Sequence, residues 1–287
     1  MLDFALIAIQ LSLVYGVSGI AVRLALAVQG GVDLFPAFVA LVGSELFVEV
    51  CNRFVVSGIW PSLSAIVSFG FCIFLGIGWA IFSRRFFTPF FEGKNTLLVS
   101  LGLLLATSGC VGLWRGPGLV VFDAFAGKTL GFVDFSVGAG MVMAIGVSLS
   151  ALLIISIYLR LRPGYALKLF LMNPDFAIEL GVEQSRMQGA GLVLASLLGA
   201  SAGMSLALVS GSYPDLGIKI FLYGAGAALL FESKVLLAPL LGGATLGVFH
   251  VCLQLAVSPS WAEGIMFAAV IFVILAKGTD RDWGGNR

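Results

Sequence analysis

The chain has 287 residues, of which 60% are hydrophobic and 11% are charged, and its mean hydropathy is +1.08. These values exclude an ordinary soluble domain and are typical of a protein with several membrane-spanning helices. The formal net charge of +1 and the scattered Lys and Arg residues argue against a nucleic-acid partner.

Apolar stretches long enough to cross a bilayer as a helix recur along the whole chain. They predict an all-α polytopic membrane protein with about nine transmembrane helices, within a range of roughly eight to ten. The predicted helices are residues 4–28, 33–51, 61–83, 95–115, 137–159, 187–209, 216–231, 235–257 and 261–277. The first two and the seventh could instead be half-helices that enter the membrane and turn back. No stretch has the polarity or length of a separate soluble domain, so we expect one transmembrane domain over residues 1–287.

Polar residues interrupt the apolar pattern at two places. Gln29 and Asp33 lie between the first two predicted helices, and Tyr213 and Asp215 precede the seventh. Broken helices at membrane depth are tolerated where they line a cavity, and paired breaks are typical of transporters built from inverted repeats. These four residues are therefore the predicted substrate path, and a shared Asp-Leu pair favours two inverted repeats. The alternative is that both places are plain turns at the membrane interface.

Residues 158–186 cannot be explained by burial in lipid, because they carry both signs of charge between two long apolar spans. The segment holds four of the chain's sixteen Lys and Arg residues: Arg160, Arg162, Lys168 and Arg186. Pro163 can begin a helix, and Asn173-Pro174 can end it and open a second one. The first of these helices has more apolar surface than a solvated loop needs. The residues alone leave open whether the bilayer surface or a partner protein covers it.

The basic residues also predict an orientation. If residues 158–186 face the cytoplasm, eleven of the sixteen Lys and Arg residues fall on that side. Since basic residues collect in cytoplasmic loops, we expect an external N-terminus and a cytoplasmic C-terminus. Residues 116–138 are then external and lie along the outer surface, and the polar tail after Lys277 is expected to fray.

Other polar residues within the spans favour structural roles. Glu45, Glu49 and Arg53 follow one another at intervals of four, so we expect Glu49 to pair with Arg53 rather than to mark an ion path. His250 is the only histidine and is expected to be a hydrogen-bonded packing residue without a metal. Small residues four apart predict close helix contacts at three places, namely Gly112 with Gly116, Gly199 with Gly203 and Gly243 with Gly247.

Much of the chain resembles, in order, the permease subunits of ABC importers of the branched-chain amino-acid type, and most closely the tryptophan/tyrosine-type subgroup. The resembling residues are Gly164, Ala166, Asn173-Pro174, Ala177, Leu180-Gly181-Val182, Met187, GLVLASLLGASAGMSLALVSG at 191–211, GIAVRLALAVQGGVDLF at 19–35, LLVSLGLLLATSGCVGLWRGPGL at 97–119 and VIFVILAK at 270–277. The chain departs from the family where Lys168 and then LFLM precede Asn173, and at the first break, VQGGVDLFPAF.

The resemblance implies that residues 160–186 contain a coupling segment, whose residues from Tyr165 to Gly181 meet a separate ATPase subunit. The implied coupling residues are Pro163, Gly164, Tyr165, Asn173, Pro174 and Gly181. It also implies two copies of the ATP-binding subunit, a second permease copy or homologue, and an extracytoplasmic substrate-binding protein. ATP and Mg²⁺ would be bound by the ATPase, so no cofactor and no catalytic residue is expected on this chain.

The expected function is that of a permease subunit in a bacterial inner membrane, which moves a small solute such as an amino acid inward by alternating access. Two rivals remain at this point. One is a secondary transporter driven by an ion gradient, and the other is a membrane-embedded enzyme. Neither rival explains an apolar pair of helices on the cytoplasmic side.

Overall fold

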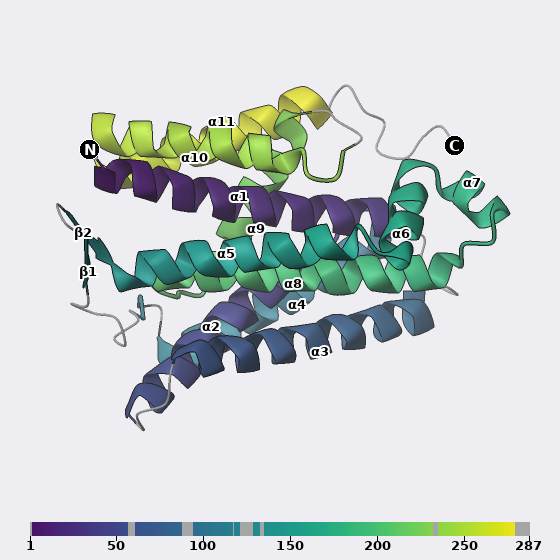
Figure 1. The fold of residues 1–287 in the computed structure, drawn as a ribbon, viewed down its shortest axis with the longest axis horizontal. Helices are drawn as coiled ribbons and strands as arrows, with labels where there is room; N and C mark the ends of the chain where they lie inside the picture. Colours follow the sequence, from purple (N-terminus) through teal and green to yellow (C-terminus); the bar gives the residue numbers. More distant parts are fainter. Residues whose placement is uncertain are drawn as a thin grey trace.

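A computed structural model describes residues 2–56, 61–87, 94–116, 118–120, 129–132, 135–231 and 235–278. Apolar helices occupy the positions of all nine predicted ones, within a few residues (Figure 1). They are α1 (Leu2–Gln29), α2 (Phe35–Val56), α3 (Pro61–Phe87), α4 (Lys94–Arg115), α5 (Ala139–Tyr158), α8 (Gln184–Ser210), α9 (Leu216–Leu230), α10 (Pro239–Ala256) and α11 (Pro259–Gly278). Two further helices, α6 (Arg162–Met172) and α7 (Pro174–Glu179), form the charged connection.

Six of these helices are long and apolar enough, over their described residues, to cross a membrane: α1, α2, α4, α5, α8 and α10. The apolar stretches described in α3, α9 and α11 are shorter. The protein is therefore a helical, membrane-embedded protein, and nine crossings remain a prediction.

The helical fold is as predicted, and the structure adds one short hairpin that was not predicted. Strand β1 (Thr129–Phe132) pairs antiparallel with β2 (Phe135–Gly138), with Thr129 opposite Gly138 and Phe132 opposite Phe135. Strands of four residues are too short to show a clear alternation of apolar and polar positions, so they could not be predicted from the sequence. The rest of the predicted external segment falls largely on residues 117, 121–128 and 133–134, which lie outside the described residues, as does the tail 279–287.

Helix α8 lies at the centre of the bundle and packs against α1, α2, α3 and α5 (Figure 1). Small residues along GASAGMS allow this close packing. A Cβ atom added at Gly199 would lie 2.4 Å from the carbonyl oxygen of Pro36, and one at Gly203 would lie 2.1 Å from that of Ala40. Lipid gives little hydrophobic drive for helix association, so van der Waals contact between backbones holds such a pair together. The predicted Gly199 and Gly203 contact is confirmed, with α2 as its partner.

Helix α1 is the second long central helix and runs antiparallel to α8. Near one end of the pair Gln10 donates to the carbonyl oxygen of Ser205, and near the other Val28 packs on Gly191. The Gly243 and Gly247 motif is also confirmed, because both glycines of α10 touch the α1 backbone. The third motif is wrong: among the described residues, an added Cβ at Gly112 would meet only Pro214, at 3.9 Å, and one at Gly116 would meet nothing within 4 Å.

The two long helices exchange partners. Helices α2 and α3 follow α1 in the chain but pack on α8, whereas α9 and α10 follow α8 but pack on α1. A five-residue link, 30–34 after α1 and 211–215 after α8, reverses the chain at each crossover. The two predicted breaks are these links, so both are fixed by helix packing on both sides.

Candidate functional site

The charged connection leaves the bundle as a compact pair of helices. After α5 the chain turns tightly, with hydrogen bonds from the Arg160 and Leu161 amides to the carbonyl oxygens of Ile157 and Tyr158. Pro163 stands in the first turn of α6, as predicted. Gly164 is required by the turn, because an added Cβ would lie 2.0 Å from the Tyr158 carbonyl oxygen. Gly164 therefore allows α6 to pack closely against the end of α5.

Helix α6 turns across the end of the bundle, and α7 projects beyond it (Figure 1). Gly164, Leu167 and Phe170 form the buried face of α6, which packs against α8. The bundle itself therefore covers much of the apolar surface of α6, for which the residues alone did not identify a partner. Tyr165, on the opposite face, is exposed.

Asn173-Pro174 ends α6 and begins α7, as predicted. Asn173 has extended backbone angles, and its Oδ1 accepts a hydrogen bond of 3.2 Å from the Phe176 amide. Pro174 occupies the first position of α7, where no amide is needed. Gly181 closes the helix at a φ of 84°, with bonds from Gly181 N to Ile178 O and from Val182 N to Ala177 O. This is the Schellman pattern, which favours glycine at this position because a side chain would be strained there.

Replacing Asn173 with Ala should weaken α7 locally. The Phe176 amide loses its acceptor, and the loss of such a cap costs about 1 kcal/mol. We expect faster amide hydrogen exchange at Phe176, with little change in the exchange of α8. Asn173→Asp keeps an acceptor and should exchange like the wild type. Equal acceleration in both variants would contradict the capping role.

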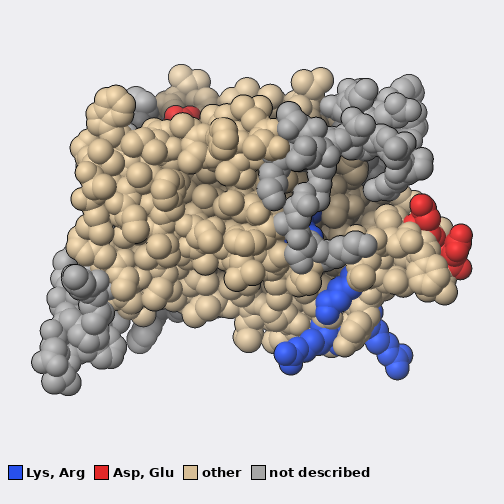
Figure 2. Space-filling model, turned by 90° about the horizontal axis from the view of Figure 1, so that it is seen from above, with Lys and Arg blue, Asp and Glu red and all other residues tan. Residues whose placement is uncertain are grey.

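The end of this segment presents both apolar and acidic side chains. Phe176, Ile178 and Leu180 are exposed, and Asp175 lies in the first turn of α7. In the space-filling view acidic atoms gather at the projecting tip, whereas basic atoms lie nearer the bundle (Figure 2). The predicted coupling residues therefore form one continuous element with a defined shape.

The first break holds Asp33 in a buried hydrogen-bond network. Its carboxylate accepts hydrogen bonds from the Phe35 amide at 2.9 Å, from Trp79 Nε1 at 3.3 Å and from Gln29 Nε2 at 3.3 Å. Asp33 is 1% exposed. Because the neighbouring Pro36 lies against Gly199 near the middle of α8, this carboxylate sits deep in the bundle. It accepts the amide of the first residue of α2 and joins α1, α2 and α3.

The second break follows the C-terminal end of α8, and it lies farther along α2 than the first break does. Asp215 is the N-cap residue of α9 and is exposed. Lys219 lies 5.7 Å from the Tyr213 ring centre and forms an ion pair of 2.5 Å with Glu263. Burial raises the pKa of the Tyr213 phenol above its ordinary value, and the charge of Lys219 partly offsets this. The structure thus joins Gln29 with Asp33 but brings neither to the second break.

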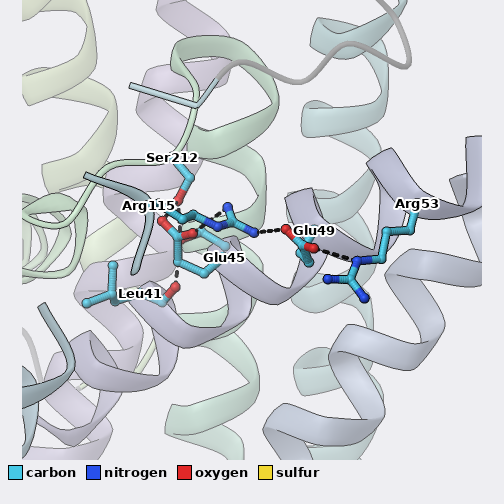
Figure 3. Close-up of polar contacts among 7 residues, drawn as sticks. Leu41, Glu45, Glu49, Arg53, Arg115 and Ser212 are labelled. Atoms are coloured by element: carbon cyan, nitrogen blue, oxygen red, sulfur yellow. Dashed lines mark hydrogen bonds and ion pairs between the residues drawn. The ribbon is translucent and has the colours of Figure 1, made fainter. Parts of the chain in front are cut away.

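A polar cluster in the C-terminal half of α2 was not predicted as a whole (Figure 3). Arg115, at the end of α4, pairs with Glu45 at 2.7 Å and also with Glu49, which pairs in turn with Arg53 at 2.5 Å. Ser212 donates to Glu45 at 2.7 Å. The predicted pair of Glu49 with Arg53 is confirmed, but no partner was predicted for Glu45. A buried acid in a span was the available signal, since it needs a cation or a donor nearby.

This cluster links three parts of the chain by ion pairs and hydrogen bonds. Ser212 also exchanges two backbone hydrogen bonds of 2.9 Å with Val120, beyond the end of α4. The side chains of Arg115 and Glu45 are 11% and 7% exposed, so their pairing is screened from water. Helix α2, the end of α4 and the second break are therefore held as one unit, about 15 Å along α2 from the first break.

His250 has the packing role expected of it. Its Nδ1 lies 2.6 Å from the Tyr15 hydroxyl of α1, and its Nε2 lies 3.3 Å from Gln254 Nε2. Within the described parts of the chain, no group of three His, Cys, Asp or Glu residues has an arrangement suited to a metal ion.

Comparison of the chain with models of protein families gives no match, and comparisons with curated proteins and with solved structures give none either. The fold and composition define the class, a helical membrane-embedded protein. Anything more specific has to be inferred from its residues and their geometry.

Proposed function

We propose that this protein is the membrane-spanning permease subunit of an ATP-driven importer, and that α7 docks on a separate ATPase subunit. The observation that carries the proposal is the form of α7. The Asn173 cap and the Gly181 turn fix its two ends, and it presents Phe176, Ile178 and Leu180 outside the bundle. A short rigid helix with an apolar surface is suited to a groove in a partner protein.

The crossed packing of the bundle supports two inverted repeats, α1–α4 and α8–α11. The two long helices are antiparallel, each is followed by a five-residue link, and each packs on the second and third helices of the other set. Each link also contains an aspartate, Asp33 two residues before α2 and Asp215 directly before α9. Such repeats are the usual basis of alternating access, in which one set moves against the other.

In this proposal two permeases and two ATPases assemble, an extracytoplasmic binding protein delivers the solute, and ATP with Mg²⁺ binds to the ATPases. The permease lies in a bacterial inner membrane with its N-terminus outside and its C-terminus in the cytoplasm. The solute is a small molecule such as an amino acid. Gln29, Asp33, Tyr213 and Asp215 are the candidate path, and Asp33 can contact solute only if the network around its carboxylate opens.

The proposal is tested with the chain purified together with an ATP-binding subunit that co-purifies with it from its native membrane. Phe176→Ala should weaken binding of the ATPase by roughly 30-fold, because an aromatic side chain at the centre of a docking surface often contributes about 2 kcal/mol or more. ATP-driven uptake into proteoliposomes should fall with it. Phe272→Ala is the matched control, since Phe272 is also an exposed phenylalanine but lies on α11. Equal effects of the two variants, or none, would overturn the docking role.

An ion-coupled carrier is the second candidate, and Asp33 is the feature that favours it. A carboxylate buried in a broken segment is the kind of group that binds a coupling ion. Liposomes containing this chain alone, with an ion gradient and without nucleotide, distinguish the two. Solute uptake under those conditions would establish the carrier, whereas uptake that requires ATP and the ATPase supports the importer.

A further inference from the structure

Three basic residues surround the corner at which α5 meets α6. Arg160 and Arg162 are exposed and come directly after the end of the α5 span, and Lys168 follows on α6. We call this group the basic corner. Basic atoms gather at this end of the bundle in the space-filling view (Figure 2).

In the described part of the protein, the three cations of the basic corner form no ion pair. Lys168 lies 5.2 Å from the Tyr165 ring centre. By contrast, Arg186, on the other side of the same connection, pairs with Glu183 at 2.6 Å. Three uncompensated cations at one place attract an anionic group from outside the chain.

The position and orientation of α6 indicate which anionic group this is. The corner directly follows a span, so it lies at the level of the lipid headgroups. Helix α6 runs across the end of the bundle, nearly perpendicular to α5 and α8 (Figure 1), which places it along the membrane surface. Its outward face carries Tyr165 and Met172, which are 60% and 63% exposed. Exposed apolar and tyrosine side chains beside basic ones are typical of a helix that lies in the membrane interface.

The first turn of α6 adds to the attraction. Its N-cap residue, Leu161, provides no side-chain hydrogen bond, so the positive end of the helix dipole is not offset by an acidic or hydroxyl cap. Phosphate groups bind readily at such an end when cations stand beside it.

We propose that the basic corner binds the phosphate headgroup of an anionic phospholipid and that α6 is an interfacial anchor. The lipid phosphate is held by Arg160, Arg162 and Lys168, while Tyr165 lies among the headgroups. The tip, α7, then remains free for a protein partner. Lipid binding at this corner would hold whether or not an ATPase docks on α7.

The test uses the detergent-purified full chain and short-chain phosphatidylglycerol, with bound lipid counted by native mass spectrometry. The wild type should bind phosphatidylglycerol more tightly than phosphatidylcholine, and added salt should reduce the difference. Arg160→Gln should weaken binding about fivefold, and the triple replacement of Arg160, Arg162 and Lys168 by Gln should weaken it about 100-fold, since each cation near a membrane surface contributes a similar factor. Arg186→Gln is the matched control and should bind like the wild type.

Several results would overturn the proposal. Equal binding of the two lipids would show that charge does not select the ligand. An equal loss in Arg186→Gln would show that the corner has no special role. Displacement of the lipid by inorganic phosphate at the same concentration would identify a soluble phosphate site instead. Should the triple variant not fold, the single Arg160→Gln variant decides, because Arg160 is an exposed residue of the turn.

Discussion

Arg115→Met is expected to lower the free energy of unfolding by about 3–5 kcal/mol, since removing one partner of a buried ion pair leaves the other charge without compensation. Arg115 pairs with both Glu45 and Glu49, and Glu45 is nearly inaccessible to water. Methionine keeps most of the side-chain volume, so the decrease in the free energy of unfolding reports the loss of the positive charge. Unfolding in mixed detergent and denaturant, followed by circular dichroism, measures it.

Two further variants separate the buried pair from a general effect of charge. Adding Glu45→Gln to Arg115→Met should recover most of the lost stability, because a neutral amide needs no cation and its oxygen can still accept the Ser212 hydroxyl. Arg53→Met should cost less than about 1 kcal/mol, as is usual for an exposed pair, since the Arg53 side chain is 74% exposed. A cost for Arg53→Met equal to that of Arg115→Met would contradict this account of the cluster.

The second large effect is expected at the crossing of α2 and α8. In Gly203→Ala the new Cβ would lie 2.1 Å from the Ala40 carbonyl oxygen and 2.9 Å from its Cα. Both neighbours are backbone atoms, so the whole of α2 has to move. Overpacking of this kind typically costs about 1–3 kcal/mol, and we expect a value near 3 kcal/mol, measured as a lower unfolding midpoint in detergent.

Gly146→Ala is the matched control for this substitution. Gly146 also lies within a long helix, α5, but an added Cβ would meet nothing within 4 Å. Alanine favours the helix relative to glycine by about 1 kcal/mol, so this variant should be as stable as the wild type or more so. If Gly203→Ala behaved in the same way, α2 and α8 would not be in the contact described.

The parts of the fold that depend on local sequence were predicted well. The nine apolar helices follow from hydropathy, because any segment of this length and composition avoids water in the same way wherever it stands. The turn at Asn173-Pro174 and the end of α7 at Gly181 follow from backbone preferences of those residues. Likewise, the ion pair of Glu49 with Arg53 could be predicted from their four-residue interval on a helix alone.

The parts that depend on distant residues were missed. Nothing in the sequence joins Arg115 to Glu45, which lies 70 positions away, or Ser212 to both Glu45 and Val120. The spacing of small residues identified two real helix contacts and one false one, because a four-residue interval does not say whether another helix lies opposite. The sequence likewise did not show that the Asp33 carboxylate has three hydrogen-bond donors, and its place in a substrate path stays a prediction.

By itself the sequence determined that this chain is built of membrane-embedded helices, where most of them begin and end, and that residues 158–186 form a structured, charged connection. Only the tertiary structure decided which helices meet, which buried charges pair, and that α6 lies across the bundle while α7 projects from it. The physical reason is that hydropathy and backbone preference act on neighbouring residues. Pairing in a bundle depends on surfaces from distant segments that fit together, and these surfaces exist only once the helices are packed.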